Sequence, residues 1–273
     1  MATPTSELPS PPFVAVEGVC NFRDIGGYPI TESNFNYVKR GLVYRSAVLC
    51  DITNDGIKTI VLALGICVIF DLRSRIELLQ IPMQFIPGVV TIHAPIFSAR
   101  ETTRDKTAER YHRFMSGDST EAAFVVAYAE ILTSGAGAYR QVFQHVRDRP
   151  NEPFLIHCAG GKDRTGVLVA LMFRIAGVSD LNVVGKEYEL TETAYPPEYR
   201  REFMEAMLGN QTGYQVELER TFSARKENIQ ASMRWLDDQY GGIEGYFKDA
   251  LKFQDEDIRK IKKNLVAREK SNF

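Results

Sequence analysis

Ten consecutive residues past the middle of the chain constrain its fold and chemistry more than any other segment. They read His157-Cys158-Ala159-Gly160-Gly161-Lys162-Asp163-Arg164-Thr165-Gly166. The apolar run Phe154 to Ile156 before them predicts a buried strand. The apolar run Val167 to Phe173 after them ends near Gly177 and predicts a buried helix with a glycine stop. Cys158 therefore falls on a tight loop between the end of a strand and the start of a helix.

This loop has the parts of an anion-binding site. Gly160 and Gly161 allow backbone conformations that a side chain forbids, so that successive N–H groups turn inward. The helix that follows adds its unpaired N–H groups and the positive end of its dipole. Arg164 can grip two phosphate oxygens with its planar fork. Although most cysteines are small buried hydrophobes, this setting predicts a phosphate pocket in which the thiolate of Cys158 attacks phosphorus.

The loop resembles the signature of the cysteine-based protein tyrosine phosphatase superfamily. The likeness is closer to its atypical tyrosine/serine/lipid phosphatase branch of bacteria and fungi, whose loop typically reads His-Cys-x-x-Gly-Lys-Asp-Arg-Thr-Gly. Further segments carry the same resemblance: Asn21 to Tyr28, Tyr44 to Ser46, Asp71 to Ser74 with Glu77, and Leu236 to Leu265. The resemblance covers nearly the whole chain after the first dozen residues. It implies hydrolysis of phosphate monoesters through a phosphocysteine intermediate, without a metal or an organic cofactor.

Each residue of the loop has an expected part in this chemistry. The phosphate-binding residues are expected to be Ala159, Gly160, Gly161, Lys162, Asp163, Arg164, Thr165 and Gly166. Lys162 either adds positive charge for the substrate or is a solvated loop lysine. The hydroxyl of Thr165 is placed to assist the thiolate as a leaving group, although an N-cap role would also explain it. The resemblance implies that His157 faces away from the phosphate and steadies the loop by hydrogen bonding.

A positioned acid must protonate the leaving group, which contributes about 10²- to 10⁴-fold to such reactions. The mobile Trp-Pro-Asp loop of the better-known tyrosine phosphatases is absent, because Trp235, the one tryptophan, is followed by Leu236-Asp237. Asp163 is the first candidate, since the resemblance implies a catalytic role there. Its alternative role is that of a structural acceptor for loop amides. Asp71 is the second candidate, and its alternative role is an ion pair with a nearby arginine.

Strands and helices alternate through the first part of the chain. The further predicted strands are Leu42 to Tyr44, Ile66 to Phe70 and Val89 to Ile92. Apolar residues at helical spacing from Ile57 to Leu64 predict a helix between the first two, with Thr53 as its N-cap and Gly65 as its stop. This alternation predicts an α/β fold, with a mostly parallel central sheet flanked by helices. Asp71 and Cys158 both lie at the ends of predicted strands, so they can share one pocket beyond the C-terminal edge of the sheet.

The chain is predicted to form one phosphatase domain over residues 13–273, preceded by a flexible lead over residues 1–12. A helical insertion is expected at about 98–149, with its clearest helices at Glu121 to Thr133 and Ala138 to Val146. Later helices are expected at Tyr199 to Leu208, Ile229 to Tyr240, Gly245 to Leu251 and Asp255 to Val266. The basic residues between Arg100 and Arg113 form either a solvated face or a lid that steers phosphorylated substrate.

Composition limits the kinds of partner and cellular location that can be expected. A net charge of −2 gives no bulk attraction to nucleic acid, and no apolar run is long enough to span a bilayer. The spacing of the four cysteines matches neither a zinc site nor a dense disulfide framework. A reducing, cytoplasmic location is expected, because Cys158 must remain a thiol to work.

Three functions remain open at this point. The first is a protein phosphatase for phosphotyrosine, with possible activity on phosphoserine and phosphothreonine. The second is a phosphoinositide phosphatase, which the extra cation Lys162 favours. The third is a catalytically silent phosphate-binding module, against which the intact Cys158, Asp163 and Arg164 argue. Sulfur transfer is disfavoured, because that chemistry does not call for arginine at this spacing. The sequence leaves the oligomeric state open.

Overall fold

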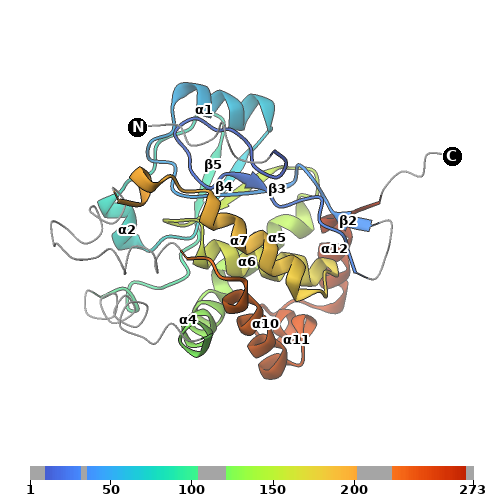
Figure 1. Ribbon diagram of the computed structural model, residues 1–273. Coiled ribbons are helices and arrows are strands. Elements are labelled where there is room, and N and C mark those ends of the chain that lie inside the picture. Colours follow the sequence, from blue (N-terminus) through green and yellow to red (C-terminus); the bar gives the residue numbers. More distant parts are fainter. Residues whose placement is uncertain (1–9, 32–35, 104–120, 202–222, 269–273) are drawn as a thin grey trace.

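The computed structural model describes residues 10–31, 36–103, 121–201 and 223–268 (Figure 1). Its main sheet has five strands in the order β1-β3-β6-β4-β5. They are β1 (Arg23–Asp24), β3 (Val43–Ser46), β6 (Phe154–His157), β4 (Val68–Asp71) and β5 (Val90–His93). The last four run parallel, and β1 alone pairs antiparallel, with β3. The predicted α/β fold with a mostly parallel sheet is confirmed.

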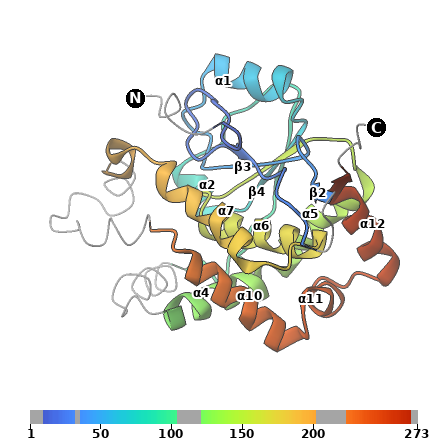
Figure 2. The same ribbon diagram turned by 45° about the vertical axis from the view of Figure 1, so that its right-hand side comes forward.

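Helices cover both faces of this sheet (Figures 1 and 2). On one face lie α4 (Glu121–Ser134), α5 (Ala136–Asp148), α6 (Asp163–Ala176), α7 (Leu181–Thr193), α10 (Lys226–Tyr240), α11 (Ile243–Asp249) and α12 (Asp255–Leu265). The other face packs against α1 (Asn54–Lys58) and the π-helical turn η1 (Thr59–Ala63). Because side chains alternate along a strand, Phe154 and Ile156 enter the larger core while Leu155 enters the core beside α1.

Shorter elements complete the described fold. The helix α2 (Arg75–Gln80) follows β4, and a separate two-stranded sheet pairs β2 (Asn36–Val38) with β7 (Val266–Arg268). The predicted caps of two helices are confirmed. The Thr53 side chain accepts a hydrogen bond from the amide of Gly56, and Gly177 ends α6 with a φ of 104°.

One helix was not predicted, and several predictions fall mostly outside the described residues. Helix α7 was not predicted, and it supplies several of the buried polar side chains described below. The expected helix from Tyr199 to Leu208 falls mostly outside the described residues. So do most of the basic residues between Arg100 and Arg113, and most of the expected lead.

Candidate active site

The candidate nucleophile lies where the sheet meets a helix. Strand β6 ends at His157 and α6 begins at Asp163, so Cys158 occupies the loop between them and is only 3% exposed. Strand β6 pairs with β3 on one side and β4 on the other, and this register fixes the point at which the loop leaves the sheet. The positive end of α6 therefore faces the loop that carries Cys158.

Of the two loop glycines, Gly161 is the one that the backbone requires. Its φ of +60° lies in the left-handed region, and a Cβ there would come within 2.1 Å of the Ser46 carbonyl oxygen. Gly160 has no positive φ, and a Cβ there would find its nearest neighbour, the Tyr195 hydroxyl, at 3.6 Å. Of the two predicted glycines, only Gly161 is therefore required, because the loop passes close to the end of β3 there.

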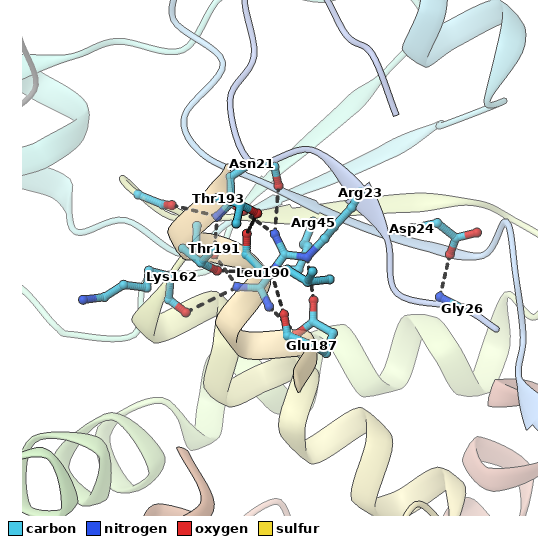
Figure 3. Close-up of polar contacts among 12 residues, drawn as sticks. Asn21, Arg23, Asp24, Gly26, Arg45, Lys162, Glu187, Leu190, Thr191 and Thr193 are labelled. Carbon is cyan, nitrogen blue, oxygen red and sulfur yellow. Dashed lines mark hydrogen bonds and ion pairs between the residues drawn. The ribbon is translucent and has the colours of Figure 1, made fainter. Parts of the chain in front are cut away.

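The carbonyl oxygens of the loop are bound by distant parts of the chain (Figure 3). The side-chain amide of Asn21 donates to the carbonyls of Gly160 at 3.2 Å and Gly161 at 3.1 Å. Arg45 donates to the carbonyls of Gly161 and Lys162. Further bonds reach the loop backbone from the Val48 amide, to Ala159 at 2.9 Å, and from the Tyr139 hydroxyl, to Arg164 at 3.1 Å. These bonds define the path of the loop.

Behind the loop lies a buried ion cluster of Arg23, Arg45 and Glu187 (Figure 3). Glu187 on α7 accepts from Arg23 Nε and from Arg45 Nη1, both at 2.7 Å, and all three side chains are at most 2% exposed. Burial and the nearby Arg45 lower the pKa of Arg23 to about 10. Burial disfavours the charge on Glu187, but the two arginines outweigh it and lower its pKa. One carboxylate from α7 thus holds the arginine that shapes the loop.

Arg164, the candidate phosphate ligand, is oriented by Glu77 of α2. Its Nη1 and Nη2 donate to the two carboxylate oxygens of Glu77 at 2.7 Å each. Glu77 also belongs to the capping box of α2, where it accepts from the Ser74 amide at 2.8 Å. Burial alone would raise the pKa of Glu77, but Arg164 and Ser74 lower it to about 2. The guanidinium is therefore held at the loop by a fixed anion.

The two candidate acids differ in their surroundings. The Oδ1 atom of Asp163 accepts a hydrogen bond from Tyr128 at 2.5 Å, and its side chain is 30% exposed. Asp71 is fully buried, and Arg73 donates to its carboxylate through Nε, Nη2 and the backbone amide. Burial opposes ionisation of Asp71, but His157 and Arg73 hold its pKa below the ordinary value. Asp71 thus makes the ion pair with a nearby arginine that the sequence suggests as its alternative role.

The assignment to a family rests on a match that spans nearly the whole chain. The family model described as "Tyrosine phosphatase family" matches residues 14–267. This chain belongs to the tyrosine phosphatase family. The enzyme class predicted from the loop, a phosphatase of the protein-tyrosine-phosphatase type, is confirmed.

Individual relatives of this phosphatase are distant but align over most of their length. The triple specificity protein phosphatase PtpB of Mycobacterium tuberculosis is 26% identical in an alignment of 266 residues that covers 85% of this chain and 92% of that protein. A putative tyrosine-protein phosphatase of Cupriavidus necator is 24% identical in an alignment of 262 residues that covers 93% of this chain and 88% of that one. The solved catalytic core of the yeast PP-IP phosphatase Siw14 superposes with a TM-score of 0.33 at 15% identity, covering 72% of this chain and 92% of its own.

Three more loop residues of this phosphatase were singled out from the sequence. His157 is fully buried, its Nδ1 lies 3.0 Å from the Cys158 carbonyl oxygen, and burial lowers its pKa. Lys162 is 7% exposed, and its Nζ donates to the Ser223 carbonyl at 3.1 Å, so it is not a solvated lysine. Lys162 is also the N-cap of α6, so the N-cap alternative for Thr165 is wrong. The Thr165 hydroxyl is buried and has no hydrogen-bond partner among the described residues.

Sequence reasoning missed three side chains that shape this phosphatase site: Glu187, Tyr188 and Tyr128. The signal for α7 was present in the apolar spacing of Leu181, Val184 and Tyr188 after the cap Asp180. Tyr128 lay in a predicted helix, but nothing local marks it as a partner of Asp163.

Within the described ranges, no group of three or more His, Cys, Asp and Glu side chains could hold a metal ion. Over the same residues, no helix is both long and apolar enough to cross a membrane.

Proposed function

We propose that this phosphatase uses Cys158 as its nucleophile and that proteins phosphorylated on tyrosine are its main substrates. The observation that carries the proposal is the pairing of Arg164 with Glu77, which holds a bidentate phosphate ligand at the loop of a buried cysteine. Arg164 and the loop amides bind the phosphate, and the helix dipole of α6 favours both the thiolate and the dianion. These groups also stabilise the charge that develops on the equatorial oxygens during transfer.

The reaction has two displacements at phosphorus. In the first, the Cys158 thiolate forms the S–P bond while the bond to the leaving oxygen breaks, and Asp163 gives that oxygen a proton. In the second, Asp163 takes a proton from water as the water oxygen bonds to phosphorus and the thiolate leaves. The buried Thr165 hydroxyl is suited to stabilising the departing thiolate. Phosphate and the alcohol or phenol are the products.

Asp163 is the proposed acid, in preference to Asp71. Its side chain is partly exposed, so a leaving group can reach it. Asp71 is enclosed by the Arg73 side chain, and giving up a proton there would require a protonated carboxyl beside a guanidinium. We therefore assign Asp71 a structural role, holding Arg73 in place at the end of β4.

Phosphoserine, phosphothreonine and phosphoinositides are the further substrates to be tested. A relative whose name states triple specificity supports a broad panel. Lys162 supports the lipid alternative less than the sequence suggested, because its ammonium group is bound to Ser223 and lies 3.6 Å from Asp163. A reducing compartment such as the cytoplasm would keep Cys158 active, and residues 13–273 would act as one domain.

The test is phosphate release from a matched panel with Cys158→Ser as the blank. The panel holds a phosphotyrosine peptide, a phosphothreonine peptide and a short-chain phosphoinositide. Peptide turnover well above lipid turnover supports the protein phosphatase, and lipid turnover that is equal or higher favours the lipid alternative. If Cys158→Ser retains appreciable turnover, the mechanism is wrong. If the wild-type protein turns over nothing while still binding inorganic phosphate, the silent binding module becomes the better account.

A further inference from the structure

Two buried tyrosine hydroxyls form a hydrogen-bonded chain that ends on Asp163. Tyr128 of α4 is 0% exposed and Tyr188 of α7 is 1% exposed. The Tyr128 hydroxyl donates to Asp163 Oδ1 at 2.5 Å. The Tyr188 hydroxyl is within hydrogen-bond distance of the Tyr128 hydroxyl and lies 3.5 Å from the same oxygen of Asp163. Helices from two distant parts of the sequence therefore converge on one carboxylate oxygen.

The direction of these hydrogen bonds follows from a count of protons. A phenol has one proton to donate. Tyr128 gives its proton to Asp163, so Tyr188 must be the donor between the two phenols. Burial, and secondly the charge of Asp163, raises the pKa of both tyrosines well above the ordinary value, so both remain protonated at neutral pH. The chain runs from Tyr188 through Tyr128 to Asp163, and each link strengthens the next.

All the contacts that the structure describes for the Asp163 carboxylate fall on Oδ1. Lys162 Nζ lies 3.6 Å from that same oxygen, which adds a cation to the two phenols. A proton on Oδ1 would force Tyr128 to reverse its hydrogen bond and would leave a buried hydroxyl without an acceptor. The Oδ2 atom has no such constraint, so it is the oxygen on which a proton can reside.

The packing around α6 allows this arrangement. Gly166 brings no side chain to the face that meets α7, and a Cβ there would lie 2.9 Å from ring carbons of Tyr188. Among the described residues, the charged and titratable groups that face Asp163 are Tyr128 from α4, Tyr188 from α7 and Lys162 from the loop. Arg45 of β3 lies on the sheet side, and its charge opposes the rise in the pKa of Tyr188.

We infer that Tyr128 and Tyr188 are positioning residues that hold Oδ1 of Asp163 as an acceptor and reserve Oδ2 for the proton exchanged in catalysis. The inference rests on the proposed function, in which Asp163 is the general acid. In the first step the Oδ2–H proton passes to the leaving oxygen as its bond to phosphorus breaks. The electron pair stays on Oδ2, and the phenols stabilise the resulting carboxylate. In the second step Oδ2 recovers a proton from the attacking water.

The pH dependence of turnover tests this inference. The kcat/KM of a phosphate monoester should fall at high pH as Asp163 loses its proton, and Asp163→Asn should abolish this basic limb. Because hydrogen bonds to the ionised form favour that form, Tyr128→Phe should move the limb upward by about one pH unit. Tyr188→Phe, which removes only the outer link, should move it in the same direction by less. A limb that stays in place in Tyr128→Phe overturns the inference.

Tyr246→Phe is the matched control. Tyr246 is also fully buried, and its hydroxyl donates at 2.7 Å to the Leu132 carbonyl of α4, the helix that carries Tyr128. Its loss removes one buried hydrogen bond to α4 without removing a donor from Asp163. The basic limb of Tyr246→Phe should coincide with that of the wild-type protein. A shift equal to that of Tyr128→Phe would mean that loosening α4 explains the effect, which also overturns the inference.

A second measurement does not depend on turnover. In protein labelled with ¹³C at the aspartate carboxyl carbon, the Asp163 resonance is identified by its loss in Asp163→Asn. Its titration midpoint should lie at higher pH in Tyr128→Phe than in the wild-type protein, and an unchanged midpoint counts against the inference. Wild-type inactivity on every substrate, or turnover that survives Cys158→Ser, defeats the proposed function instead. The two failures are therefore distinguishable.

Discussion

Arg164 donates two parallel hydrogen bonds to Glu77, each 2.7 Å long, across the space between α6 and α2. Glu77 is itself fixed, because the Ser74 amide binds the same carboxylate in the capping box. The fork of Arg164 is thus oriented before any anion arrives. Such preorganisation reduces the ordering that binding must otherwise bring about.

Glu77→Gln should lower kcat/KM for phosphate monoesters by about tenfold, since a charge-assisted hydrogen bond and the orientation of Arg164 are lost. The measurement is steady-state kinetics on an aryl phosphate. The control is Glu152→Gln, which removes an exposed arginine pair, Arg149–Glu152 at 2.8 Å, and should leave the kinetics unchanged. Tighter phosphate binding in Glu77→Gln would mean instead that Glu77 competes with the substrate for Arg164.

The same carboxylate predicts a pH dependence of stability. In the fold Glu77 has a pKa of about 2, against an ordinary 4.5. A lowered pKa stabilises the fold fully above the unfolded-state value, and the stabilisation is lost as pH falls from about 4.5 to 2. It is on the order of 3 kcal/mol. Urea unfolding at a series of pH values should show this loss in the wild-type protein and a smaller one in Glu77→Gln. Equal losses in both proteins would assign the acid sensitivity to other carboxylates.

Glu187→Gln should destabilise the fold by about 3 kcal/mol or more, because it leaves two buried guanidinium groups without their counter-charge. The free energy of unfolding in urea measures this directly. Glu189→Gln, on the same helix α7 but partly exposed, is the control and should change it little. A loss of less than about 1 kcal/mol for Glu187→Gln would show that water enters the cluster and screens it.

Gly161→Ala and Gly160→Ala form a pair of adjacent substitutions with opposite expected outcomes. Alanine at Gly161 meets a positive φ and the Ser46 carbonyl, so it should destabilise the protein by more than about 1 kcal/mol and abolish most turnover. Alanine at Gly160 makes an ordinary contact at 3.6 Å and should fold normally. Thermal unfolding and phosphate release on both variants check this. Equal tolerance of the two substitutions would contradict the close crossing of the loop over β3.

Asp163→Asn should slow an alkyl phosphate more than an aryl phosphate with a good leaving group, because an alkoxide needs the proton more. The loss on the alkyl substrate should be about 10²-fold or more. Asp71→Asn should instead lower stability, with losses in turnover that do not depend on the leaving group. The comparison of both substrates across both variants decides between the two acids, and the reverse pattern would make Asp71 the acid.

The loop, its strand and its helix were predictable because their signals are local. Apolar runs mark β6 and α6, and the residues between them bring anion-binding chemistry to Cys158. Helix α7 was missed because its apolar spacing, although present, is interrupted by charged and polar residues, one of which, Glu187, is buried. Its burial depends on Arg23 and Arg45, which lie more than 140 residues away in the sequence. No local pattern reveals such a pairing.

Asp163, the proposed acid, also has a partner that lies far from it in the sequence. The sequence placed Asp163 in the loop, and family resemblance implied a catalytic role for it. The phenol of Tyr128 reaches Asp163 only because α4 packs beside α6, a tertiary contact that helical spacing does not specify. The proposed catalytic residues were therefore accessible from sequence, and the family resemblance also marked the segments that carry Asn21, Arg45 and Glu77. The partners on α4 and α7 were not accessible in this way.

The bonds that Asn21 and Arg45 make to the loop carbonyls have a consequence for how this enzyme can diversify. They lie on the side of the loop that faces the protein interior, and both donor side chains are almost fully buried. The preference for a negatively charged ligand that we propose for the loop is thereby set from inside the molecule. Exposed residues around the loop can therefore change, and with them the size or class of phosphorylated molecule admitted, without disturbing the sign of the charge that the loop is proposed to bind.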